Sequence, residues 1–242
     1  MSLRKYWAIP AIALMTVVMS TLAVLSTLLS GKGRLQHGCA RLWARFILRV
    51  SGVRWRAEGL GRLPADRPCI LMSNHQSNMD IPILLTALPI PFRFLAKESL
   101  FRIPFLGWYL RRCRHIPIHR EDPRKAVRSL RDAAEKIRGG VSVLVFPEGT
   151  RSEDGHLQEF KKGGFLLGTF SGALLVPVAI AGSRQVLPKG SSDLRSGKVS
   201  LAVGEPLDAA GASSRDADRL MDEMRRRIEE TFRRASGAPD AR

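Results

Sequence analysis

The chain has 242 residues, and its 39 Lys and Arg outnumber its 22 Asp and Glu, which gives a formal net charge of +17. This length is enough to bury one sizeable core, and the basic charge predicts an anionic partner such as a nucleic acid, a lipid surface or a phosphorylated substrate. Three scattered cysteines, Cys39, Cys69 and Cys113, lack metal-ligand spacing. They argue against disulfides and a zinc site, and they fit a reducing compartment.

An uncharged apolar run occupies residues 6–29. As a helix it would be about 36 Å long, against about 30 Å for the hydrocarbon core of a bilayer. It is too long for a typical signal-peptide core. Basic residues flank both ends, at Arg4, Lys5, Lys32 and Arg34, so the positive-inside rule gives no direction for a single span. A helix that enters one leaflet and returns would leave both ends on the cytoplasmic face.

The next stretch, residues 33–52, has the pattern of an amphipathic helix. Its apolar side chains recur at helical spacing, at Leu42, Trp43, Phe46, Ile47 and Val50. Its arginines fall on another face, at Arg41, Arg45 and Arg49. Such a helix lies in a membrane interface or packs on a globular domain, and the neighbouring apolar run favours the membrane interface.

Beyond residue 52, short apolar runs alternate with helical segments. The predicted strands lie at residues 68–74, 92–97, 114–120, 141–147, 174–182 and 199–207. The predicted helices lie at residues 79–88, 123–138 and 214–234. This alternation predicts an α/β fold with a mixed, largely buried sheet flanked by helices, preceded by a membrane-embedded helical segment at the N-terminus.

The helix predicted at residues 123–138 carries its own boundary signals. Asp122 is a candidate N-cap, Pro123 suits the first turn, and Gly139 can end the helix. The side chains expected to form its buried stripe are Val127, Leu130, Ala134 and Ile137.

The chain shows neither an internal repeat nor a linker after residue 55. We therefore predict N-terminal membrane-anchoring helices over residues 1–51, one α/β domain over residues 52–236 and a flexible tail over residues 237–242.

A first polar cluster, "NHQSNMD", follows the strand predicted at residues 68–74. Ligands of open α/β folds bind beyond the carboxyl ends of strands. There Asp80 could accept a hydrogen bond from one ring nitrogen of His75, which leaves the other nitrogen to take a proton from a hydroxyl. This is the base and orienting carboxylate of a catalytic triad without a protein nucleophile. The alternative is structural, with Asp80 capping the helix and His75 bonding a backbone carbonyl, and for this short motif alone the alternative is favoured.

A second cluster, "FPEGTRSEDG", follows the strand predicted at residues 141–147. Gly149 allows the backbone to approach a ligand closely, and Arg151 offers a planar fork that matches phosphate oxygens. Glu148 could accept hydrogen bonds from substrate hydroxyls or position Arg151, and Thr150 lies between them. The alternative is a surface turn held by a Glu–Arg pair. It leaves unexplained why both clusters lie at strand ends of one predicted sheet.

With these motifs the chain resembles the glycerolipid acyltransferase family, which is typified by 1-acylglycerol-3-phosphate acyltransferases. "NHQSNMD" matches the His-x4-Asp block of that family and "FPEGTRS" matches its third block. The second block corresponds to "KESL" and "IPIHR", which end at Leu100 and Arg120, and the fourth corresponds to "VPVAI". The His-x4-Asp block and the third block together are highly specific.

The resemblance implies acyl transfer from acyl-CoA or an acyl carrier protein to the sn-2 hydroxyl of 1-acylglycerol-3-phosphate, which gives phosphatidic acid. It implies that His75 is the general base and that Asp80 orients it. The residues assigned to substrate binding are Lys97, Arg120, Glu148, Gly149, Thr150 and Arg151. Arg120 and Arg151 are the candidates for the acceptor phosphate, and Lys97 contacts phosphate or carrier groups or is a solvated surface lysine. No metal or cofactor beyond the acyl donor is expected.

Other classes of protein stay open from the sequence. A family member acting on another lysolipid, such as a lyso-aminolipid, would carry the same motifs. A non-catalytic, basic membrane-surface protein would explain the apolar run and the charge but would not need His75 and Asp80 together. A nucleic-acid-binding protein would explain the charge alone, and no recognition signature supports it. We therefore expect membrane lipids and a lysophospholipid as partners, and a catalytic domain on the cytoplasmic face of a membrane.

Overall fold

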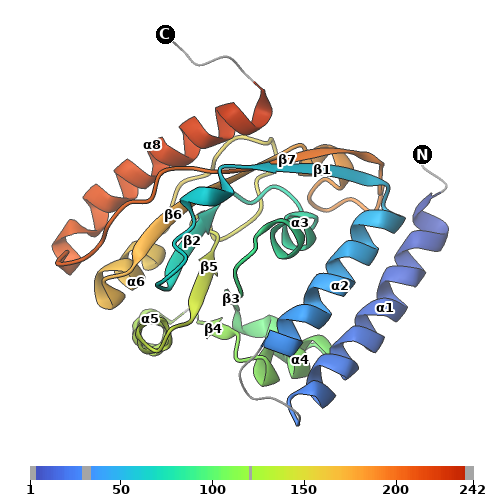
Figure 1. Ribbon diagram of the computed structural model, residues 1–242, viewed down its shortest axis with the longest axis horizontal. Coiled ribbons are helices and arrows are strands. Elements are labelled where there is room, and N and C mark those ends of the chain that lie inside the picture. The colour runs from blue at the N-terminus through green and yellow to red at the C-terminus, as the bar shows by residue number, and fades with distance from the viewer. Residues whose placement is uncertain (1–3, 29–33, 120–121, 238–242) are drawn as a thin grey trace.

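The computed structural model of the chain describes residues 4–28, 34–119 and 122–237 (Figure 1). Its centre is a seven-stranded sheet with the order β1-β7-β6-β2-β5-β3-β4. The strands are β1 (Val53–Glu58), β2 (Cys69–Ser73), β3 (Phe92–Lys97), β4 (Ile116–Ile118), β5 (Ser142–Val145), β6 (Leu174–Ala181) and β7 (Gly197–Val203). Five neighbouring strands, from β6 to β4, are parallel, and β7 is antiparallel to β6. The predicted mixed sheet is confirmed, and β1 is a strand that the sequence pattern did not predict.

Helices cover both faces of this sheet. They are α1 (Arg4–Ser26), α2 (Arg34–Val50), α3 (Asp80–Ala87), α4 (Leu106–Arg112), α5 (Pro123–Arg138), α6 (Gly163–Ser171), α7 (Ser183–Val186) and α8 (Ala217–Ser236). Short 3-10 turns are η1 (Leu60–Arg62), η2 (Glu98–Arg102) and η3 (Ser214–Asp216). In Figure 1, α5, α6 and α8 lie on one face, whereas α2 and α3 lie on the other with α1 outside them.

The core divides along the central strand β2, whose five residues are all buried. Leu71 contributes to the cluster that contains α2 and α3, while Ile70 and Met72 contribute to the cluster that contains α5, α6 and α8. Successive side chains of a strand point to opposite faces, so a strand covered on both faces must be apolar throughout. This is why the run at residues 68–74 shows no polar alternation.

The helix α5 begins and ends as predicted. The Asp122 side chain accepts a hydrogen bond from the Lys125 backbone N–H at 3.1 Å, and Gly139 caps the C-terminus. One member of the expected buried stripe is wrong, because Val127 is 37 % exposed. The buried face instead passes through Ala126 and Leu130, one helical turn apart, and this rotates Val127 toward solvent.

The two N-terminal helices pack against each other and against the domain. The Trp43 indole donates a hydrogen bond to the Thr16 hydroxyl at 2.9 Å, which ties α2 to α1. On its other side α2 packs on α3, where the Arg41 guanidinium donates to the carbonyl of Leu85 at 3.2 Å and to that of Leu88. The structure therefore shows α2 packed on the domain, with Ile47 buried in the domain core and Arg45 and Arg49 exposed, and its place in a membrane interface remains a prediction.

The helix α1 is long and apolar enough to cross a membrane. Its segment Tyr6–Ser26 has a mean hydropathy of 2.2, and only 17 % of that window is buried. Lys32 and the end of the apolar run at residue 29 lie outside the described residues, as does the predicted tail from residue 238 onward.

Candidate active site

The first motif lies in the loop between β2 and α3, and it is anchored to a neighbouring strand. Asn74 is fully buried, and its amide exchanges two hydrogen bonds with the backbone of Ile180 on β6, at 2.9 Å and 2.8 Å. The Asn74 side chain therefore extends the hydrogen bonding between β2 and β6 by one more residue pair. Because β2 and β5 are adjacent and parallel, the loops that follow them meet at one edge of the sheet.

The predicted histidine–carboxylate pair is formed. The Nδ1 atom of His75 lies 2.8 Å from Oδ2 of Asp80, and the Asp80 side chain is completely buried. The same oxygen accepts the backbone N–H groups of Gln76 and Ser77 at 2.8 Å and 2.9 Å. Because an ionised carboxylate only accepts, Nδ1 carries the proton and Nε2 is left with its lone pair. Asp80 thus closes the loop and orients the imidazole, and the contacts of the structural alternative, a side-chain cap on the helix and a bond from the His75 ring to a backbone carbonyl, are not among the described hydrogen bonds.

The imidazole of His75 is also fixed by stacking and by its own backbone. Its ring lies 3.9 Å from that of Phe146, with an interplanar angle of 14°. Its backbone N–H donates to Oε1 of Glu148 at 2.6 Å, and its carbonyl accepts the Ser152 N–H at 2.8 Å. The loop after β5 therefore holds the histidine from three sides, while 14 % of the histidine side chain remains exposed.

Glu148 has a contact that the sequence did not predict. The residue is 2 % exposed, and its second oxygen accepts the Gln158 N–H at 2.9 Å. Burial raises the pKa of this carboxyl to about 7, against the lowering effect of its two backbone hydrogen bonds. Among the described ion pairs there is none between Glu148 and Arg151. Glu148 is thus a brace for the backbone of His75, and its predicted contact with substrate hydroxyls remains a prediction.

The remaining residues of the second motif lie on the outer side of the same loop. Gly149 has φ +71°, a left-handed conformation that favours glycine. Thr150 is exposed and Arg151 is half-buried. The Lys189 ammonium lies 3.4 Å from the Thr150 hydroxyl, so a cation from the segment after α7 joins the motif. No local pattern in the sequence indicates this lysine.

Two more predicted binding residues follow the outer strands. Lys97 ends β3 and is exposed at the same edge of the sheet as His75, because β3 is parallel to β5. Arg120 lies outside the described residues. Its neighbour His119 is 3.8 Å from Glu98, measured from Nδ1 to Oε2. Within the described residues, no cluster of three His, Cys, Asp or Glu side chains could hold a metal ion.

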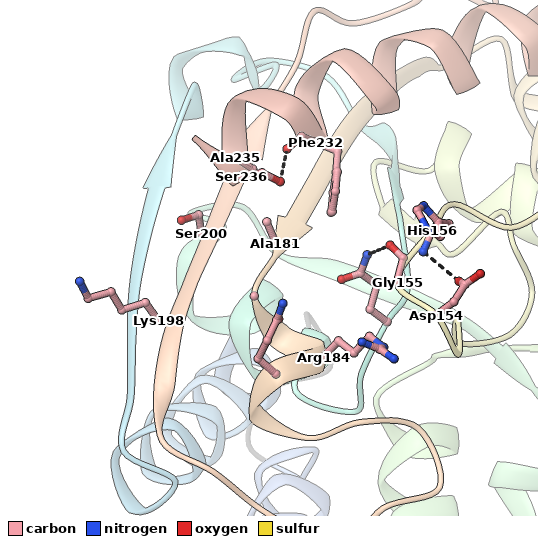
Figure 2. Close-up of a pocket in the computed structure, with 13 residues that line it drawn as sticks. Asp154, Gly155, His156, Ala181, Arg184, Lys198, Ser200, Phe232, Ala235 and Ser236 are labelled. Carbon is pink, nitrogen blue, oxygen red and sulfur yellow. Dashed lines mark hydrogen bonds between the residues drawn. The ribbon is translucent and has the colours of Figure 1, made fainter. Parts of the chain in front are cut away.

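A cavity of about 480 Å³ lies behind the second motif (Figure 2). It is bounded by the 154–156 loop, by the ends of β6 and β7 and by the C-terminal turn of α8. The residues that line it include Arg184, Lys198 and Gln76, and the Gln76 amide donates to the Gly155 carbonyl at 2.7 Å. His75 is not among the described lining residues, so the cavity borders the loop of the first motif but is not lined by its histidine.

Comparison with known proteins assigns the family. The model of the family described as Acyltransferase matches residues 54–181, which is more than half of the chain, and the chain belongs to this family. The chloroplastic 1-acyl-sn-glycerol-3-phosphate acyltransferase BAT2 of Brassica napus is 37 % identical over 201 residues, which cover 82 % of this chain and 56 % of that protein. The 1-acyl-sn-glycerol-3-phosphate acyltransferase of Pseudomonas aeruginosa is 30 % identical, covering 78 % of this chain and 75 % of that protein.

A solved structure shows the same fold. The crystal structure of the 1-acyl-sn-glycerophosphate acyltransferase PlsC from Thermotoga maritima superimposes with a TM-score of 0.80 at 30 % identity, covering 99 % of this chain and 97 % of that chain. The chain spans little more than half the length of the Brassica napus relative. The predicted α/β acyltransferase fold is confirmed.

Proposed function

We propose that this protein transfers an acyl group from acyl-CoA or an acyl carrier protein to the sn-2 hydroxyl of 1-acylglycerol-3-phosphate, giving phosphatidic acid. The family and the names of its relatives support this reaction. The observation that carries the proposal is the contact of 2.8 Å between His75 and the buried carboxylate of Asp80 at the carboxyl end of β2.

In the proposed reaction, Nε2 of His75 removes the proton of the acceptor hydroxyl as that oxygen attacks the thioester carbonyl. Asp80 stabilises the imidazolium that forms. When the tetrahedral intermediate collapses, the carbon–sulfur bond breaks and the leaving thiolate takes the proton from His75. The acyl group passes directly to the acceptor, so the reaction uses no protein nucleophile.

We assign the acceptor phosphate to two arginine side chains from the sequence motifs. Arg151 follows Gly149 in the loop that braces His75, and its guanidinium can bind two phosphate oxygens at once. Lys97 is the last residue of β3, at the same edge of the sheet as His75, and Arg120 comes after β4 in the sequence, outside the described residues. The two arginines are proposed to hold the phosphate, and Lys97 to add charge for the phosphate or the anionic carrier.

We also propose that α1 attaches the protein to a membrane with the domain on the cytoplasmic face. The helix exposes most of its apolar side chains. It packs along α2, and α2 packs on α3, so α1 could not stand across the bilayer without drawing the domain into the hydrocarbon core. This packing supports an arrangement with both ends of α1 on one side of the membrane, and we propose the cytosolic side because both acyl donors are cytosolic.

A panel of lysolipids tests the proposed acceptor. The purified chain in vesicles is given one labelled acyl-CoA and, in separate reactions, 1-acylglycerol-3-phosphate, lysophosphatidylcholine and a lyso-aminolipid. Labelled phosphatidic acid should be the main product, and it should disappear in His75→Ala. Preferential acylation of the lyso-aminolipid would replace the acceptor, whereas no acylation of any lysolipid by folded protein would contradict the enzymatic function.

A further inference from the structure

Four large apolar side chains are exposed on the segment between β3 and β4. They are Leu100 at 38 %, Ile103 at 45 %, Phe105 at 36 % and Trp108 at 55 % exposure, and we call them the 100–108 patch. Single exposed apolar residues are ordinary, but a group of this size within one short segment marks an interaction surface.

The fold of this segment holds the patch outward. Phe101, in the middle of the segment, is 6 % exposed, and its carbonyl accepts a hydrogen bond from the Arg111 guanidinium. A Cβ atom on Gly107 would collide with the same carbonyl, so η2 and α4 are packed as closely as a glycine permits. Outside this turn, the rings of Phe105 and Trp108 meet edge to face at 5.1 Å. The exposure is therefore a property of a packed turn.

The patch adjoins both the active-site edge and α1. The turn η2 directly follows Lys97 at the end of β3, and β3 is parallel to the strands that lead to His75 and Glu148. The helix α4 packs against α1 near the C-terminal end of α1 (Figure 1). In the C-terminal half of α1, Leu22 and Leu25 are 46 % and 53 % exposed. The apolar surface of α1 thus continues onto the 100–108 patch.

Basic side chains surround the patch. Arg102, Arg111, Arg112 and Arg114 are all exposed in the same segment. Of these, Arg102 is paired with Glu98 at 2.8 Å. Tryptophan and arginine next to aliphatic side chains are typical of a protein surface that lies at the lipid headgroups of a membrane. In such a surface the aromatic rings lie in the interface and the guanidinium groups bind anionic phosphates.

We propose that the 100–108 patch enters the same leaflet as α1 and forms a second membrane contact beside the active site. A single anchoring helix leaves a domain free to rotate about the helix axis. A second contact at α4 fixes that rotation and turns the carboxyl edge of the sheet toward the bilayer. This inference goes beyond the proposed reaction, because it does not depend on which lipid is the acceptor.

The test measures where residue 103 lies in the intact chain. Ile103→Cys and the control Val127→Cys are made in a Cys39→Ser chain, labelled with the fluorophore NBD and reconstituted in vesicles of phosphatidylcholine and phosphatidylglycerol. Val127 is a matched control because it is also apolar and 37 % exposed, but lies on α5 on the other face of the sheet. Cys69 and Cys113 are buried and should not be labelled in folded protein.

Nitroxide lipids should quench the label at residue 103 several-fold more strongly than the label at 127, while aqueous iodide should show the reverse order. Iodide quenching at both positions without lipid quenching would overturn the proposal. Protection of residue 103 from both quenchers would also overturn it, in favour of contact with a second copy of the chain. This readout needs no enzyme activity, so it is judged separately from the proposed function.

A double variant tests the consequence for orientation. Ile103→Ser with Trp108→Ser should lower turnover of a vesicle-presented acceptor several-fold and leave turnover of a short-chain, water-soluble acceptor unchanged. Val127→Ser should change neither. Equal loss on both acceptors would show that the patch supports the fold, and would contradict the proposed role of the membrane contact.

Discussion

Replacing Asp80 by Asn tests how the site holds its histidine. In the protein one carboxylate oxygen accepts hydrogen bonds from the His75 ring and from the backbone of Gln76 and Ser77, all within 2.9 Å. An asparagine oxygen can keep these contacts, but its uncharged amide no longer stabilises the imidazolium. A charge-assisted hydrogen bond contributes about 1.5–3 kcal/mol, which corresponds to a loss of roughly 10- to 150-fold in kcat.

The same substitution should also lower stability. The other oxygen of Asp80 is buried and has no hydrogen-bond partner among the described residues, so the new amide would place an unpaired donor there. That costs about 1–3 kcal/mol. The assay follows release of free CoA thiol at saturating acyl-CoA, together with the Tm of each variant. Glu159→Gln is the control, because it removes an exposed carboxylate from the nearby 153–160 loop. A folded Asp80→Asn enzyme with unchanged kcat would refute the assigned role.

Further predictions concern the base, the phosphate, acid stability and the membrane. His75→Ala should lose about 10²–10⁴-fold in kcat with little change in Tm, since the contacts of residue 75 with Glu148 and Ser152 use its backbone and are kept. Arg151→Ala should raise KM for 1-acylglycerol-3-phosphate, with poor rescue by Lys, whereas equal loss on phosphate-free acceptors would make the arginine structural. Burial lowers the pKa of His37 to about 4 and that of His115 to about 3. In the unfolded chain the pKa of these histidines is about 6.5, so between about pH 6.5 and 4 the unfolded chain binds more protons than the folded one. The Tm should therefore be higher above pH 6.5 and fall as the pH drops toward 4. Finally, the apolar surface of α1 should keep the chain on membranes in high salt, because salt screens the arginines of the chain but not apolar contacts. Sedimentation with vesicles measures this.

The elements that the sequence predicted are those with strong local signals. The buried strands β2, β5 and β6 are continuous apolar runs, and α5 carries its own caps. The strand β1 was not predicted because it lies at the edge of the sheet, and three of its six residues are exposed and charged, which leaves no continuous apolar run. The helix α6 was not predicted because its nine residues are apolar on every side and begin with two glycines, a pattern without helical period.

The same distinction applies to the candidate site, where the sequence predicts contacts between residues close in the chain but not contacts between distant ones. His75 and Asp80 are five residues apart, so a loop and the first turn of a helix are enough to join them, and the sequence predicts the pair. The brace from Glu148 spans 73 residues and the pairing of Asn74 with Ile180 spans 106. These contacts depend on the order of β6, β2 and β5 in the sheet, which no local pattern indicates. Lys189 reaches the Thr150 loop for the same reason.

The most direct test of the proposed mechanism is a single-turnover reaction of the intact protein with acyl-labelled CoA thioester, analysed by mass spectrometry. With 1-acylglycerol-3-phosphate present, direct transfer with His75 as base predicts phosphatidic acid that carries the label at the sn-2 position. Without acceptor, it predicts protein free of covalent acyl groups. A labelled acyl–protein that passes its acyl group to later-added acceptor would contradict direct transfer, and label on any other position would contradict the assigned acceptor hydroxyl.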